Sequence, residues 1–197
     1  KVQSELHVPA PISPYGAAKL AGEQYCHAFY RSFGLEPVTL RYFNVFGPRQ
    51  DPASPYSAVI PLFITTMLRG ETPTIFGDGT QSRDFTYIDN VVHGNLLAAD
   101  AETISGEPIN MANGESNSLL DVVALINKYL MIDDHQPSDI SKTINPIEPM
   151  FAAARKGDIL HSRADIERAM SQLEYESQVD FSTGIAKTVE YYRNLPC

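Results

Sequence analysis

The feature that most constrains the fold is a helix-forming run followed directly by a strand-forming run. Ser13 is a good N-cap, Pro14 suits the first helical position and Gly34 is a natural stop, which predicts one helix between residues 13 and 34. Residues 37–47, PVTLRYFNVFG, are rich in β-branched and aromatic side chains and predict a buried strand that ends in a loop. A helix that alternates with a buried strand favours a parallel α/β fold for the first fifty residues.

The rest of the chain predicts a mixed and more loop-rich arrangement. We expect a helix over about 58–69, strands near 73–77 and 81–89, and a helix through about 101 that Asp89 caps. A strand over 107–113 and an amphipathic helix over 118–130 follow. Residues 133–149 carry three prolines and predict loop, and two closing helices are expected near 164–172 and 182–194.

Composition excludes several classes of partner. The net charge of −9 and the pI near 4.9 argue against a nucleic-acid-binding face and against an anionic membrane surface. Apolar runs stay well short of the roughly 20 residues of a membrane span. Two cysteines suit a reducing compartment, so a cytoplasmic location is expected, and the five histidines show no metal-ligand spacing. We therefore assign no metal site.

Tyr15 and Lys19 are the first candidate catalytic residues. Positions four apart share one face of a helix, so the phenol and the ammonium can be neighbours. A nearby ammonium favours a phenolate, and a phenolate can take a proton from a substrate hydroxyl. The alternative is a core tyrosine beside a lysine whose ammonium reaches solvent.

Four segments in register resemble one family. SPYGAAKLAGEQY resembles the Tyr-x-x-x-Lys helix of the extended short-chain dehydrogenase/reductase superfamily, in its NAD-dependent nucleotide-sugar epimerase/dehydratase branch. LRYFNVFGPRQ, GDGTQSRDFTYID and RKGDILHSRADI resemble the same branch in the same order. Together the four segments span most of the chain.

The resemblance implies an α/β fold: the C-terminal part of a Rossmann-type doubly wound parallel sheet plus a smaller mixed α/β substrate-binding subdomain. Residues 1–50 would be the remainder of the NAD-binding domain, with the catalytic helix and the strand after it. Residues 51–197 would mainly bind the nucleotide sugar, with some segments returning to the sheet. The family's glycine-rich fingerprint and a further catalytic serine or threonine would lie upstream of residue 1. We therefore expect the 197-residue chain by itself to be inactive, and to bind NAD poorly or to aggregate.

The resemblance also implies roles for particular residues. Tyr15 would be the general base and acid on the sugar hydroxyl, and Lys19 would hydrogen-bond the nicotinamide ribose of NAD. Phe43 would lie against the nicotinamide end of the cofactor. The residues implied for the nucleotide sugar are Asn44, Val59, Thr74, Ile75, Phe76, Arg83, Arg155, Asp158 and Ser162. Among these, Arg83 and Arg155 would clamp the diphosphate, to which the planar arginine fork is suited.

Plainer interpretations stay open for several of these residues. Arg83 and Asp84 could form a surface pair after a turn. Asp158 could shape a turn without contacting a ligand. Asp89 suits an N-cap better than a catalytic acid. Arg41, inside the predicted strand, could form a buried structural ion pair.

The implied reaction is NAD-dependent epimerisation at C4 of a UDP-sugar through a 4-keto intermediate. The sugar would be UDP-glucose/UDP-galactose or UDP-GlcNAc/UDP-GalNAc. Ser162 stands where some family members place a bulky aromatic residue, so a small side chain would leave room for an N-acetyl group; alternatively it is only a serine near the start of a helix. A nucleotide-sugar 4,6-dehydratase and a non-catalytic nucleotide-sugar-binding fragment are the alternatives. The family also implies a homodimer, for which Gln24, His27 and Arg31 could supply a helix face.

Overall fold

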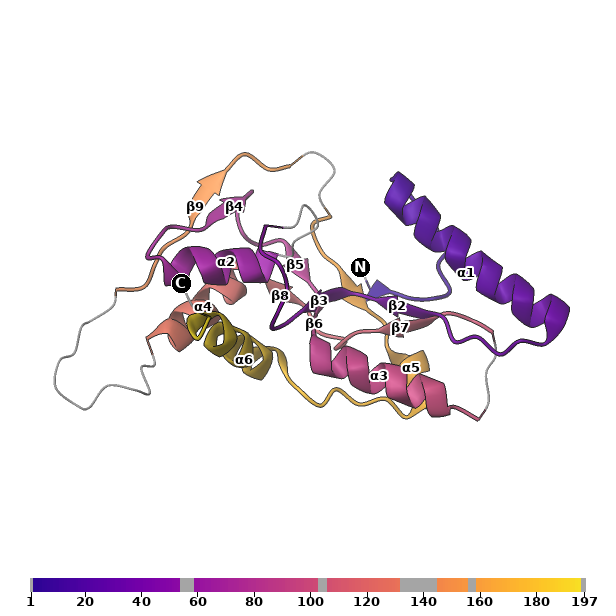
Figure 1. Cartoon of the computed structure of the whole chain (residues 1–197). Helices are drawn as coiled ribbons and strands as arrows, with labels where there is room; N and C mark the ends of the chain where they lie inside the picture. Colours follow the sequence, from indigo (N-terminus) through magenta and orange to yellow (C-terminus); the bar gives the residue numbers. More distant parts are fainter. Residues whose placement is uncertain (1, 54–58, 103–105, 132–144, 156–158, 196–197) are drawn as a thin grey trace.

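The computed structural model describes the whole chain except residues 1, 54–58, 103–105, 132–144, 156–158 and 196–197 (Figure 1). The helices are α1 (Pro14–Phe33), α2 (Val59–Leu68), α3 (Ile88–Asp100), α4 (Leu119–Leu130), α5 (Glu167–Leu173) and α6 (Phe181–Arg193). The strands are β1 (Val2–Gln3), β2 (Leu40–Tyr42), β3 (Asn44–Phe46), β4 (Thr74–Phe76), β5 (Ser82–Arg83), β6 (Phe85–Tyr87), β7 (Ile109–Met111), β8 (Asn117–Ser118), β9 (Met150–Ala152) and β10 (Arg163–Ala164). The fold class is α/β, as the sequence predicts.

Parallel pairing dominates between the described strands. β1 pairs with β10, β2 with β7, β3 with β6 and β4 with β9, all in parallel. Only β5 and β8 among the described strands pair antiparallel. Parallel partners need long crossovers, and α2 lies on the crossover from β3 to its partner β6.

Helix α1 forms where the sequence predicts it. The Ser13 hydroxyl accepts a hydrogen bond from the Gly16 N–H at 3.1 Å, and Pro14 opens the first turn. Gly34 ends the helix in the left-handed region at φ 65°, which a residue without a Cβ adopts at low cost. No residue of this fully described helix is buried, so its apolar face lies open in this chain.

The predicted strand over 37–47 divides at Phe43. β2 pairs with β7, whereas β3, immediately after it, pairs with β6. The chain therefore changes its pairing partner at Phe43. The predicted strand over 81–89 divides in the same way, into β5 and β6 on either side of Asp84.

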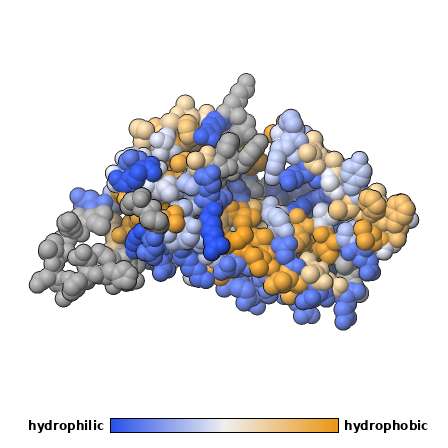
Figure 2. Space-filling model, viewed as in Figure 1, coloured by the Kyte–Doolittle hydropathy of each residue, from blue (hydrophilic) through white to orange (hydrophobic). Residues whose placement is uncertain are grey.

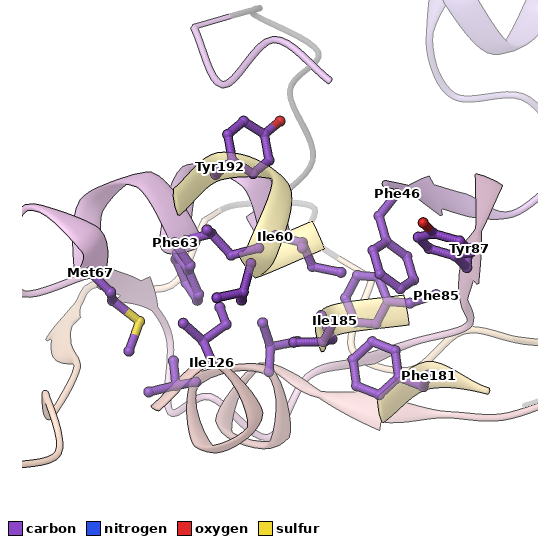
Figure 3. Close-up of a cluster of buried hydrophobic side chains, with 14 of the residues drawn as sticks. Phe46, Ile60, Phe63, Met67, Phe85, Tyr87, Ile126, Phe181, Ile185 and Tyr192 are labelled. Atoms are coloured by element: carbon purple, nitrogen blue, oxygen red, sulfur yellow. The ribbon is translucent and has the colours of Figure 1, made fainter. Parts of the chain in front are cut away.

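Two hydrophobic clusters hold the described part of the chain together. The larger one joins α2, α4 and α6 to β3, β4 and β6, and lies on the left in Figure 1. Figure 3 shows its aromatic end, where the ring of Phe46 meets those of Tyr87 and Phe181 edge-on at 5.6 and 5.7 Å between centroids. The smaller cluster joins α3, β7 and α5 through Ala98, Ile109, Met111, Ala169, Leu173 and Tyr175. The division of the chain at residue 50 stays a prediction.

Several helix boundaries refine the sequence predictions. Tyr87, not Asp89, is the N-cap of α3, so the predicted cap is wrong and Asp89 lies in the first turn. There its carboxylate interacts favourably with the positive end of the helix dipole and pairs with the Lys187 ammonium at 3.6 Å. Ser118 caps α4 in a capping box with Asp121. Most of the loop predicted over 133–149 lies outside the described residues.

The exposed surface carries many large apolar side chains. Val92 and Leu96 of α3 are exposed, as are Tyr25, Phe29 and Phe33 of α1. Figure 2 shows apolar residues gathered on the lower right face, in the region that α3 occupies in Figure 1. Of the helices described, none is both long enough and apolar enough to cross a membrane.

Candidate functional site

The first part of the site is the start of α1. The Lys19 ammonium lies 5.4 Å from the centre of the Tyr15 ring, so the helix spacing predicted from sequence brings the two groups together. Tyr15 is 63% exposed, and Lys19 is exposed as well. The plainer alternative of a core tyrosine is therefore wrong for this chain. A phenol and an ammonium are presented together at an accessible surface.

Arg41 and Glu23 tie α1 to the sheet. The Arg41 Nε donates to Glu23 Oε2 at 2.8 Å and its Nη2 donates to Oε1 at 2.6 Å. Hydrogen bonding to this carboxylate raises the pKa of the Arg41 guanidinium, partly against the effect of burial. The ion pair that the sequence suggested for Arg41 is confirmed, but it is partly rather than fully buried, and its partner Glu23 belongs to the helix that carries Tyr15.

A second contact fixes the far end of α1. The Tyr30 ring packs so closely on Gly106 that a Cβ there would lie 2.5 Å from a ring carbon. The His27 Nδ1 lies 3.4 Å from the Gly106 carbonyl oxygen. His27 thus faces the body of this chain. Of the dimer face predicted from Gln24, His27 and Arg31, only Gln24 and Arg31 are exposed.

Phe43 and Asn44 lie at the point where the strand divides. The Phe43 N–H donates to the Met111 carbonyl at 3.3 Å, on the β7 side, and the Asn44 N–H donates to the Asp84 carbonyl at 3.1 Å, on the β6 side. The Asn44 side chain is exposed. In parallel sheets, ligands bind outside the carboxyl ends of strands, and Phe43 and Asn44 directly follow the carboxyl end of β2.

Asp84 is a buried carboxylate that joins three segments. Its Oδ1 accepts from the Asn113 N–H at 3.0 Å, and its Oδ2 accepts from the N–H groups of Gly114 and Ala164 at 3.0 and 3.1 Å. Burial raises the pKa of Asp84 to about 6, and the three N–H donors partly offset that rise. The predicted surface pair of Arg83 with Asp84 is therefore wrong, since Asp84 is fully buried.

Strand β4 carries the residues predicted for the nucleotide. The Ile75 side chain is fully buried in the larger hydrophobic cluster, whereas Thr74 and Phe76 point to the opposite, accessible face because strand side chains alternate. The Arg155 guanidinium lies 4.0 Å above the Phe76 ring. An aromatic ring and an arginine together can bind a base and a phosphate. Ile75 can take part only through its backbone.

Arg83 and Ser162 are joined through one stretch of backbone. Arg83 Nη1 donates to the carbonyls of Ser82 and Leu160 at 2.9 and 3.3 Å. The Ser162 N–H donates to the Ser82 carbonyl at 3.0 Å, and the Ser82 N–H donates to the Leu160 carbonyl at 2.8 Å. Two residues that are 79 positions apart thus lie on adjacent backbone segments.

Other predicted residues lie elsewhere or cannot be placed. Val59 opens α2 and packs against the larger hydrophobic cluster. Asp158 lies outside the described residues. Within the described ranges, no group of three His, Cys, Asp or Glu side chains could hold a metal ion.

The sequence analysis missed a hydroxyl–imidazole chain beside Arg83. Ser116 Oγ donates to Ser82 Oγ at 2.7 Å, and Ser82 Oγ lies 3.0 Å from the His161 Nδ1. Nothing in the spacing of these three residues suggests that they meet. A signal existed only in their positions, because Ser82 and His161 directly precede two residues that were predicted to bind substrate.

Comparisons with known proteins show the family of this chain. A family model described as "NAD dependent epimerase/dehydratase family" matches residues 2–112, more than half of the chain. A protein named as a putative UDP-glucose 4-epimerase from Methanocaldococcus jannaschii is 34% identical over 190 residues, which are 96% of this chain and 56% of that protein.

Two solved structures share the fold closely. A UDP-glucose 4-epimerase from Thermotoga maritima, solved with UDP-glucose, matches with a TM-score of 0.84 and 38% identity over 97% of this chain and 57% of that one. A UDP-N-acetylglucosamine 4-epimerase from Methanobrevibacter ruminantium, solved with UDP-N-acetylmuramic acid, matches with a TM-score of 0.83 and 39% identity. The match covers 95% of this chain and 56% of that one. The chain spans little more than half the length of these relatives. It belongs to the NAD-dependent epimerase/dehydratase family.

Proposed function

We propose that the protein containing this chain is an NAD-dependent 4-epimerase of a UDP-sugar. The observation that carries the proposal is the Tyr15–Lys19 pair, held 5.4 Å apart at the accessible start of α1 in a member of this family. A protein that only bound a nucleotide sugar would have no need of a phenol beside an ammonium.

Tyr15 takes the proton from the C4 hydroxyl of the sugar and returns it after the configuration has changed. Lys19 supports the negative charge on the phenol oxygen and donates to the ribose of the cofactor. Lys19 is suited to binding the hydroxyls of a ribose, because its ammonium has three N–H bonds and lies at an exposed surface beside Tyr15. NAD, when bound, accepts and returns a hydride. Phe43 would lie against the nicotinamide end of the bound cofactor.

The nucleotide part of the substrate binds along β4 and β5. Phe76, Thr74 and the backbone of Ile75 contact the uridine, and Arg155 and Arg83 contact the diphosphate. The Arg155–Phe76 stack supports this assignment, since it already holds a guanidinium beside a partly exposed aromatic ring. Asn44 binds the diphosphate from the divided strand, Asp158 contacts the nucleotide ribose, and Val59 borders the sugar.

Ser162 determines which sugars fit. Its backbone is fixed against Ser82, one residue from Arg83, so a side chain at 162 has little freedom to move away from the sugar. A serine there leaves space for an N-acetyl group. We therefore propose that UDP-GlcNAc is a substrate as well as UDP-glucose.

The complete protein is proposed to be cytoplasmic and homodimeric, and to carry the NAD-binding half upstream. Supporting this, α1 buries no residue here, and its apolar face and that of α3 are exposed. Surfaces of this kind are normally covered in a finished protein. The 197-residue chain expressed by itself is then expected to aggregate or to bind NAD weakly.

The test begins with the intact mass of the protein from its source cells. A mass well above 21.8 kDa supports the proposal, and that protein is assayed with UDP-glucose and UDP-GlcNAc. Tyr15→Phe should lower kcat by about 10²–10⁴-fold, whereas Tyr25→Phe, on the same helix and equally accessible, should leave it unchanged. A 4,6-dehydratase would instead release a 4-keto-6-deoxy sugar. Unchanged kcat in Tyr15→Phe, or a native mass of 21.8 kDa without turnover, contradicts the proposal.

A further inference from the structure

Three residues of α1 lie in one row at successive four-residue spacings: Tyr15, Lys19 and Glu23. Side chains four apart on a helix are neighbours, with Cβ atoms about 5–6 Å apart. Lys19 therefore has two neighbours on this face. One is Tyr15, over whose ring its ammonium lies. The other is Glu23, at the same spacing on the next turn of the helix.

Glu23 and Lys19 do not pair in this structure, because Arg41 occupies the Glu23 carboxylate. Both carboxylate oxygens accept from the guanidinium, at 2.8 and 2.6 Å. The Glu23 side chain is only 12% exposed and that of Arg41 is 26% exposed. A bidentate pair that is largely shielded from water is stronger and more sharply oriented than an exposed one.

We propose that Arg41 is a positioning residue that holds Glu23 away from Lys19 and so keeps the Lys19 ammonium available to Tyr15 and to the cofactor. This inference rests on the proposed function for its consequence in catalysis. Its structural part, competition between Arg41 and Lys19 for one carboxylate, concerns this chain alone. An ammonium drawn toward Glu23 would move one turn along the helix, away from the phenol.

Because of the charges around Arg41, the loss of Arg41 and the loss of Glu23 should have different consequences for Lys19. Glu5 and Glu107 also act on Arg41 electrostatically, and Glu5 accepts a hydrogen bond from the Asn110 N–H at 2.9 Å. Removing the charge of Glu23 leaves Arg41 near two other carboxylates. Removing Arg41 leaves the shielded Glu23 carboxylate without its cation, and Lys19 is the neighbouring cation on its own helix.

The experiment compares Arg41→Met, Glu23→Gln and the double variant in the protein as its source cells produce it. The first readout uses protein from which bound NAD has been removed and to which no substrate is added. It is the rate at which an amine-specific reagent labels Lys19, measured by mass spectrometry. Lys128 is the internal control, since its ammonium also lies over a tyrosine ring, 5.1 Å from the centre of Tyr129. The second readout is the amount of NAD that remains bound after dilution.

In Arg41→Met we expect Lys19 labelling to slow by about threefold relative to Lys128, because a carboxylate now holds the ammonium. NAD retention should fall with it. Glu23→Gln should label like the wild type, and the double variant should recover both readouts. Unchanged Lys19 labelling in Arg41→Met, or a double variant as impaired as Arg41→Met, overturns the proposal, because the pair would then only tie α1 to the sheet.

Arg41→Gln provides a second measurement if Arg41→Met does not fold. Its amide can donate to Glu23 but carries no charge, so Lys19 labelling should be intermediate. Wild-type labelling in Arg41→Gln overturns the proposal. Because labelling needs neither substrate nor turnover, a protein that lacks epimerase activity but shows these labelling changes would fail the proposed function and still support the competition.

Discussion

The central carbon of the Arg155 guanidinium lies over the Phe76 ring, 4.0 Å from the ring centre. A cation over an aromatic face contributes about 0.5–2 kcal/mol, depending on how well it is shielded from water. The ring thus holds the guanidinium at the end of β4, where the diphosphate is proposed to bind.

We predict that Arg155→Lys raises the KM for the nucleotide sugar by about threefold to thirtyfold with little change in kcat. Lysine keeps the charge and loses the planar fork, so ground-state and transition-state binding weaken together. Steady-state kinetics of the protein from its source cells provide the measurement.

Phe76→Leu should raise KM in the same direction, because the guanidinium loses its platform. Arg168→Lys is the matched control, since Arg168 donates to the Pro108 carbonyl, away from β4. A fall in kcat with KM unchanged would contradict binding of the diphosphate by Arg155.

Ser162→Tyr should lower kcat/KM for UDP-GlcNAc at least about tenfold more than for UDP-glucose, because the ring fills the space of the N-acetyl group. The comparison uses both sugars with the same preparation. Ser171→Tyr, at an exposed position of α5, should affect neither. Equal losses with the two sugars would show that residue 162 does not select the sugar.

Asp84 should give the protein a pH-dependent stability with a definite sign. Its pKa in the folded state is about 6, above the ordinary aspartate value of 3.8, so folding is favoured while the group is protonated. The stabilising contribution is therefore full below pH 4 and is lost as pH rises through 6. Asp84→Asn removes this titration.

The measurement is the difference in Tm between wild type and Asp84→Asn across pH 4–7. The Tm of the wild type should exceed that of the variant most at pH 4, and this difference in Tm should shrink toward pH 7. The variant should be less stable at every pH by about 1–3 kcal/mol, because an amide N–H₂ must face at least one of the three backbone N–H donors. A margin that grows with pH would mean that these donors outweigh burial.

Two helix-interior glycines should respond oppositely to alanine. A Cβ on Gly94 in α3 would lie 2.3 Å from the Met111 sulfur, so Gly94→Ala should destabilise by about 1–3 kcal/mol. Gly22 in α1 has no atom within 4 Å of such a Cβ, so Gly22→Ala should stabilise by about 0.5–1 kcal/mol. Thermal unfolding provides both values. If Gly22→Ala destabilises the protein from its source cells, another part of that protein covers this face of α1.

Local signals predicted the helices and the proximity of Tyr15 and Lys19 well. Ser13, Pro14 and Gly34 bound α1 as expected, and Tyr15 and Lys19 meet because a helix places residues four apart on one face. The stack of Arg155 on Phe76 was not predictable in the same way. Its residues are separated by almost eighty positions, and it depends on the parallel pairing of β4 with β9.

The sequence by itself thus determined the family, the α/β class and the spacing of Tyr15 and Lys19, because each of these depends on short stretches of chain. The tertiary structure alone decided that the strand divides at Phe43, that Asp84 is buried between three N–H donors and that Arg41 takes the Glu23 carboxylate. These features arise from contacts between segments far apart in the chain. Neither helical periodicity nor strand alternation specifies which distant segments become neighbours.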